Sequence, residues 1–169
     1  MEPVTESLPP CPVPEDQQPL REYQALRESW FFRWALAPFP HLLPPLLGIW
    51  VGSWAIAAPV AAASFAPSRH LGLFLVTSAL GASIPSFLVL AQLYLGWRYV
   101  GDRLLRPAVS YEESGWFDGQ IWQKPGAILS RDRLIFTYEI RPLLRRMEQL
   151  FALGGVFLLG AALSWPFLP

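Results

Sequence analysis

The chain has 169 residues, of which 53% are hydrophobic and only 15% are charged, with 13 basic and 13 acidic side chains. Soluble domains carry about 25% charged residues, so a soluble globule is not expected. The zero net charge provides no electrostatic footprint for nucleic acid. A single cysteine, Cys11, excludes an internal disulfide framework and a CxxC site, and it is expected to be a surface thiol.

Charged residues are absent from three long stretches of the chain. These uncharged blocks, 34–68, 70–97 and 149–169, contain 35, 28 and 21 residues. A helix needs roughly 20 apolar residues to cross a bilayer core about 30 Å thick, so each block is long enough to span. The sequence therefore predicts an all-α membrane protein with three transmembrane helices.

Residues 1–33 are expected to form a polar arm that ends in a short amphipathic helix. The first 20 residues contain six prolines and no basic residue, which is unlike a secretory signal or a transit peptide. Apolar residues then recur at three- and four-residue spacing, as in an amphipathic helix: Leu20, Tyr23, Leu26, Trp30 and Trp34. The aromatic end of this helix is expected at the membrane interface.

The three spans are placed at 45–66, 71–97 and 149–166, within a single membrane domain. The first is not expected to begin before Pro45, because prolines remove backbone donors from a helix. The second is expected to bend at Pro85. A two-span alternative, in which the short third segment is re-entrant, also has to be considered.

The stretch 98–148 between the second and third spans is a polar loop with nine basic and seven acidic residues. Short strand-like runs at 109–113 and 120–123 flank an Asp118–Gly119 pair, which predicts a small β-hairpin. Ser130 is expected to cap a helix over 131–140. Pro142 is expected to bend the chain before the third span.

Basic residues also predict the orientation of the chain. With three spans, the arm and the loop lie on one side and carry twelve Lys and Arg residues, against Arg69 alone on the other side. The positive-inside rule then places the N-terminus in the cytoplasm or stroma and the C-terminus across the membrane.

Two histidines are the candidate pigment ligands. His41 and His70 suggest chlorophyll or haem, because neutral imidazole is a common ligand of such metals. They lie at opposite ends of the first span and so cannot share one metal. The alternative is that both are ordinary interfacial histidines, and no other metal site is expected.

Small residues and loop acids have a structural interpretation. The pair Gly48 and Gly52 is expected to pack against this chain's own helices.

Glu112 and Glu113 point to opposite faces of a strand, which disfavours joint catalysis. We expect these acids to form an ionic network with the arginines of the loop: Arg98, Arg103, Arg131 and Arg133. The residues expected to shape the loop are Tyr111, Glu112, Glu113, Gly115, Asp118 and Gly119.

Several motifs resemble a known family. They are 11–20, which reads CPVPEDQQPL; Glu22 and Tyr23; 29–32, SWFF; 93–97, LYLGW; 111–120, YEESGWFDGQ; Trp122, Lys124 and Pro125; and 131–134, RDRL. Together they are similar to a family of small membrane proteins of cyanobacteria and chloroplasts, conserved in the green lineage and diatoms, with a plastid reading frame in some algae. The resemblance implies a tie to photosynthesis, iron limitation and photoprotection, and it supplies no catalytic residues.

The expected function is that of a non-catalytic auxiliary factor in the thylakoid membrane. Its partners would be membrane lipid and subunits of a photosynthetic complex, which it would help to assemble, stabilise or protect. The expected partner-binding residues are Trp116, Phe117, Trp122, Arg131 and Arg133. Two alternatives remain: a pigment- or haem-handling protein that uses His41 or His70, and a small membrane enzyme that acts on lipid or isoprenoid.

Overall fold

A computed structural model of the chain describes residues 11–112 and 119–167. The order of elements is η1 (Glu15–Gln17), α1 (Pro19–Glu28), η2 (Phe32–Leu36), α2 (Phe39–Ser64), α3 (Leu71–Leu105), β1 (Ala108–Tyr111), β2 (Gln120–Gln123), α4 (Gly126–Ile135), η3 (Phe136–Ile140), α5 (Arg141–Ser164) and η4 (Trp165–Phe167). The predicted fold class is confirmed: three long apolar helices are joined by a polar region with a two-stranded antiparallel sheet.

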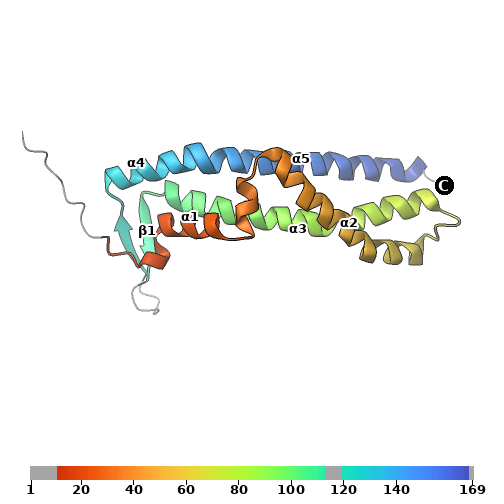
Figure 1. The fold of residues 1–169 in the computed structure, drawn as a ribbon, viewed down its shortest axis with the longest axis horizontal. Helices are drawn as coiled ribbons and strands as arrows, with labels where there is room; N and C mark the ends of the chain where they lie inside the picture. Colours follow the sequence, from red (N-terminus) through yellow and green to blue (C-terminus); the bar gives the residue numbers. More distant parts are fainter. Residues whose placement is uncertain (1–10, 113–118, 168–169) are drawn as a thin grey trace, which may run out of the picture.

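The molecule is an elongated bundle (Figure 1). Helix α3 runs beside the continuous helix formed by α4, η3 and α5, while α1 and α2 lie against α3 from its two ends. We call the end that carries the hairpin the head end, and the end that carries the connection 65–70 the far end. At 35 residues, α3 is about 52 Å long, so it exceeds a 30 Å bilayer core by about 20 Å.

The three long helices expose most of their apolar side chains. In the most apolar 18-residue stretch of α2, only 6% of the residues are buried within the protein. The same share is 22% for α3 and 6% for the helix from Gly126 to Phe167. Ile56 and Val60, for example, are 75% and 68% exposed. Water disfavours an apolar surface of this extent, whereas lipid solvates it.

The buried core lies toward the head end. Trp97 and Leu104 of α3 are fully buried, as are Ile140 and Met147 of the helix beside it. Residues of α1, η2 and the first turns of α2 close this core. Buried side chains therefore hold the helices together mainly at the head end. The apolar spans bury fewer side chains within the protein.

Helix α2 begins at Phe39, six residues before the expected start of the first span. Pro40 lies in the first turn, where a missing N–H group costs no helical hydrogen bond. The N–H groups that Pro44 and Pro45 lack would have paired only with carbonyl groups near the start of the helix. The helix continues through both residues and through Pro59. The prediction that these prolines delay the helix was wrong.

The polar part of the chain also differs from the prediction in two helix boundaries. Helix α1 ends at Glu28 because Ser29 is extended, and the aromatic residues that follow belong to η2. Helix α4 begins at Gly126 after Pro125, so Ser130 lies inside it and its hydroxyl donates to Gly126 O at 2.8 Å. The predicted cap at Ser130 was therefore wrong.

A π-helical turn replaces the bend that was expected at Pro142. In η3 the N–H of Arg141 donates to Phe136 O, five residues back, immediately before the proline. The wide turn accommodates the missing N–H of Pro142, so the helix continues from Gly126 to Phe167. A Cβ atom on Gly101 would lie 3.0 Å from the ring of Phe136 and 3.2 Å from Ile140, so a glycine on α3 permits the close approach of η3.

Candidate functional site: the polar head

The polar half of the molecule folds into one unit at the head end, which we call the head. It comprises residues 11–36, the last two turns of α3, the strands β1 and β2, and helix α4 with η3. The two strands pair in antiparallel register, with Ala108 opposite Gln123 and Tyr111 opposite Gln120. A two-stranded hairpin is marginal by itself, so its contacts with the rest of the head decide its stability.

A buried ion pair fastens the hairpin to the ends of two helices. Lys124, directly after β2, donates from Nζ to Asp132 Oδ2 at 2.8 Å, and the two side chains are only 1% and 2% exposed. The same ammonium donates to Arg103 O at 3.1 Å and Leu104 O at 3.0 Å, two carbonyls of the last turn of α3. A cation at a helix C-terminus is favourable, because unpaired carbonyls and the helix dipole are negative there.

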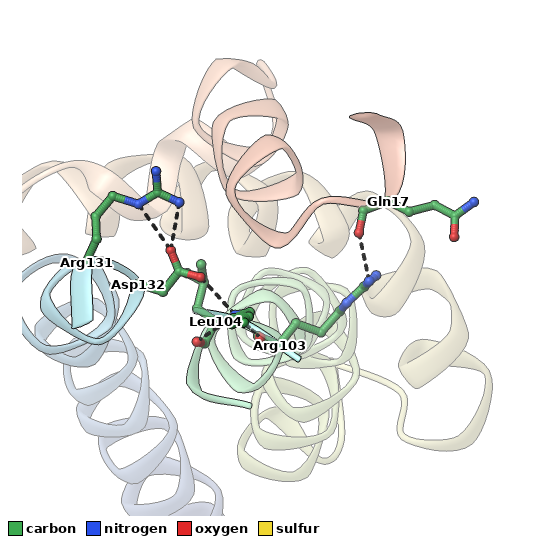
Figure 2. A network of polar contacts seen from close by, with 6 residues as sticks. Gln17, Arg103, Leu104, Arg131 and Asp132 are labelled. Atoms are coloured by element: carbon green, nitrogen blue, oxygen red, sulfur yellow. Dashed lines mark hydrogen bonds and ion pairs between the residues drawn. The ribbon is translucent and has the colours of Figure 1, made fainter. Parts of the chain in front are cut away.

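Asp132 has a second partner on the opposite side. Its Oδ1 accepts hydrogen bonds from Nε and Nη2 of Arg131 at 3.3 and 3.1 Å. Figure 2 shows Asp132 between Arg131 and the end of α3. Both oxygens of this buried carboxylate are thus paired, which is the condition under which a buried charge is tolerated.

The N-terminal arm forms the second connection of the head. Arg103 of α3 pairs with Glu22 of α1 and donates from Nη2 to Gln17 O at 2.9 Å. The side-chain amide of Gln17 donates to Glu112 O and accepts from Glu112 N, both at 3.0 Å, so it extends the edge of β1. The arm thereby joins α3 to the hairpin.

The contact between α1 and Arg103 shifts the pKa of the Glu22 carboxyl group. Burial raises the pKa of Glu22 above its usual value, and the charge and hydrogen bond of Arg103 oppose that rise. Its second oxygen, Oε2, is buried without a hydrogen-bond partner among the described residues.

A third connection joins α1 to η3. The hydroxyl of Tyr23 donates to Glu139, and Arg27 approaches both groups, with Nη1 3.3 Å from the tyrosine oxygen and 3.6 Å from Glu139 Oε2. Burial and the neighbouring Glu139 carboxylate raise the pKa of Tyr23 to about 12. The ring also packs edge-on against Trp97, whose indole N–H donates to Phe32 O at 3.1 Å.

The residues expected to bind a partner lie in different surroundings. Trp122 is half-buried and packs against a small cluster of Val13, Val109 and Tyr111, so it helps to hold the arm on the hairpin. Ile121, beside it, is 72% exposed on the other face of the strand. Arg131 and Arg133 are both exposed on α4, but Arg131 also pairs with Asp132.

Several expected loop residues fall outside the described ranges. They are Glu113, Gly115, Trp116, Phe117 and Asp118. Tyr111 is buried and its hydroxyl donates to Gln120, while Gly119 is exposed. Among the described residues, Arg98 pairs with Asp102, Arg103 with Glu22 and Arg131 with Asp132. The part of the expected ionic network that involves Glu113 and Asp118 lies outside the described ranges and stays a prediction.

The two histidines lie apart and near the ends of helices. His41 is exposed in the first turn of α2, and His70 is exposed immediately before α3. Within residues 11–112 and 119–167, no group of three His, Cys, Asp or Glu side chains is placed to hold a metal ion. Pigment ligation by either histidine stays a prediction.

The sequence did not reveal the three connections that build the head. Lys124 is the only lysine in the chain, but Asp132 lies eight positions further along, beyond a proline. Glu22 and Tyr23 lie 81 and 116 residues from Arg103 and Glu139, so no local spacing signals these pairs.

These features define a class of protein: a bundle with three helices of membrane-spanning length and a folded polar head on one end. The chain belongs to the CGLD27-like family, conserved in the green lineage and diatoms, which it matches over residues 11–153. No solved structure matches the chain.

The relatives come from plants and algae. A chloroplastic protein of Arabidopsis thaliana, named conserved in the green lineage and diatoms 27, is 39% identical over 156 residues, which cover 92% of this chain and 48% of the plant protein. The chain therefore spans about half the length of that relative. A protein named ycf36 from Pyropia yezoensis is 36% identical over 90% of this chain and 93% of its own length. A protein of the same name from Cyanophora paradoxa is 40% identical over 88% of this chain and 92% of its own length.

Proposed function

We propose that this protein is a non-catalytic auxiliary factor of the thylakoid membrane, whose head docks onto a subunit of a photosynthetic complex and supports its assembly, stability or protection. The proposal places the head in the cytoplasm or stroma, because the arm and the loop carry twelve of the thirteen basic residues. The chloroplastic relative supports a plastid-type membrane setting.

The observation that carries the proposal is an exposed apolar and basic face on α4 and η3. Leu134 and Tyr138 lie one turn apart and are 57% and 75% exposed. Arg133 and Arg141 are exposed beside them. A large aromatic residue with aliphatic and arginine neighbours is typical of the energetic centre of a protein interface.

The construction of the head supports the same role. The buried Lys124–Asp132 pair, the arm contact at Arg103 and the Tyr23–Glu139 bond join the hairpin, the arm and α4 to α3 or η3. A surface held in one arrangement before binding loses little conformational entropy when a partner docks. The head is thus suited to present a fixed face.

Affinity purification from photosynthetic membranes tests the proposal. Replacing Leu134 and Tyr138 together by alanine should release the co-purifying subunits while the chain stays in the membrane, since truncating a central interface residue weakens binding by about 30-fold or more. Leu163→Ala, at an equally exposed site at the far end, is the matched control.

Two results would contradict the docking proposal. The first is undiminished co-purification by the double variant. The second is purification of the wild-type protein with no stoichiometric subunit but with a bound chromophore in its absorption spectrum, which would favour pigment handling instead.

A further inference from the structure

The space between α2 and α5 in the head-end half of the spans forms an apolar groove. Both helices pack on α3, and two adjoining cavities of about 280 and 180 Å³ lie between them. The two cavities share Leu43, Leu46, Ser86, Phe87 and Gly154. We call this space the α2–α5 groove.

The groove has a defined floor and one closed end. A Cβ atom on Gly154 would collide with the ring of Phe87, so this glycine allows the ring to lie as the floor between the helices. Trp50 and Phe157 close the groove toward the far end, with ring centroids 6.4 Å apart and an interplanar angle of 86°. From Leu43 to Trp50 the groove extends for about 10 Å along α2.

The open end of the groove meets a guanidinium group. Arg146 lies one helical turn before Leu150, which lines the groove. Among the described residues, Arg146 makes one hydrogen bond, from Nη1 to Ala37 O at 3.4 Å, just before α2 begins. A guanidinium has five N–H donors, so most of this group's hydrogen-bonding capacity is available to another acceptor.

The side chains around the open end of the groove carry a positive charge. Arg145 and Arg146 are adjacent, and Arg33 lies on η2, which contacts α5. The nearest acid along the helix, Glu148, accepts a hydrogen bond from Tyr94 at 3.2 Å on the side of α3. An occupant of the groove is therefore expected to be apolar along its length and anionic at the head end.

We propose that the α2–α5 groove holds an acyl chain of an anionic phospholipid, whose phosphate is bound by Arg146. Arginine suits this contact because its planar fork matches two phosphate oxygens. The lipid fills the gap that α2 and α5 leave on α3, and so it acts as a structural part of the bundle. This inference does not depend on a partner for the head.

Reconstitution in nanodiscs tests the proposal. The probe is an equimolar mixture of phosphatidylglycerol and phosphatidylcholine with identical acyl chains, and native mass spectrometry counts the lipids retained after release from the disc. The wild-type chain should retain one phosphatidylglycerol. Arg146→Gln should lower the preference over phosphatidylcholine about fivefold, the usual effect of one cation near a headgroup.

Matched variants separate a bound lipid from general attraction. Arg145→Gln removes the same charge at the same depth from a neighbouring direction on the helix, and it should lower the preference clearly less than Arg146→Gln does. Leu153→Trp, at the rim of the groove, should reduce retention of both lipids, whereas Leu159→Trp, at another exposed leucine of α5, should not.

Three results would overturn the proposal. Equal losses in Arg145→Gln and Arg146→Gln would show that the lipid only responds to the overall field. Equal retention of the two lipids, or retention of neither, would remove the phosphate contact. Extraction of a different apolar molecule, such as a prenyl quinone or a pigment, from protein purified in its native membrane would assign the groove to that occupant.

Discussion

Breaking the Lys124–Asp132 pair should loosen the hairpin and α4 without removing the chain from the membrane. Asp132→Leu leaves a buried ammonium whose remaining contacts are the carbonyl oxygens of Arg103 and Leu104. Removing one partner of a buried ion pair typically costs about 3–5 kcal/mol. Lys124→Met should cost less, because Asp132 keeps its hydrogen bonds from Arg131.

Hydrogen exchange followed by mass spectrometry can measure this loss region by region. A destabilisation of about 3 kcal/mol corresponds to a rise of more than 100-fold in the opening equilibrium, which should be visible in the amides of β1, β2 and α4. The far halves of α2 and α5 should exchange as in the wild type. Arg133→Met, which removes an exposed charge one residue from Asp132, is the matched control.

A double-mutant cycle gives the sharpest test of this reasoning. If the two groups stabilise the head through each other, the combined variant Lys124→Met and Asp132→Leu should lose less stability than the sum of the single variants. Additive losses would refute the coupling. Exchange in Asp132→Leu within about threefold of the wild type would refute the energetic importance of the pair altogether.

Two further predictions concern the arm. The pKa of Tyr23 is raised from 10.0 to about 12, so its contribution to stability is present below pH 10 and is lost as the pH rises toward 12. In Tyr23→Phe, the unfolding temperature should therefore depend less on pH between 10 and 12 than it does in the wild type. Parallel curves of unfolding temperature against pH for the two proteins would contradict the raised pKa of Tyr23. Gly96→Ala should displace the ring of Phe32 and lower the unfolding free energy by about 1–3 kcal/mol, whereas Gly155→Ala, with open space around its Cβ position inside α5, should not lower the unfolding temperature.

The packing of small residues shows how local patterns can mislead. Gly48 and Gly52 were expected to contact the chain's own helices, yet both are exposed, and no atom of another helix in the described part of the chain lies within 4 Å of a Cβ atom built on either. The side of α2 that does contact α3 carries Trp50 instead, whose indole N–H lies 3.3 Å from Ala79 O and 3.1 Å from Ser83 Oγ. Spacing identifies a smooth helix face, but it does not say which neighbour the face meets.

The sequence by itself determined the number and type of the long helices and the existence of the hairpin. These features follow from local chemistry: uncharged blocks of sufficient length, and strand-like runs on either side of a turn-forming pair. Helix boundaries near Pro44, Ser130 and Pro142 did not follow, because a proline's effect depends on which carbonyls find other donors and on whether a wider turn can form.

Only the tertiary structure decided how the head is assembled. Lys124 meets Asp132 because the end of α3 and the first turns of α4 converge on one buried point, and Glu22 meets Arg103 because the arm folds back along α3. The same arrangement turned Trp122 toward the hairpin cluster and left Ile121, Leu134 and Tyr138 outside. Such contacts join residues far apart in the chain, and their geometry exists only once the helices have packed.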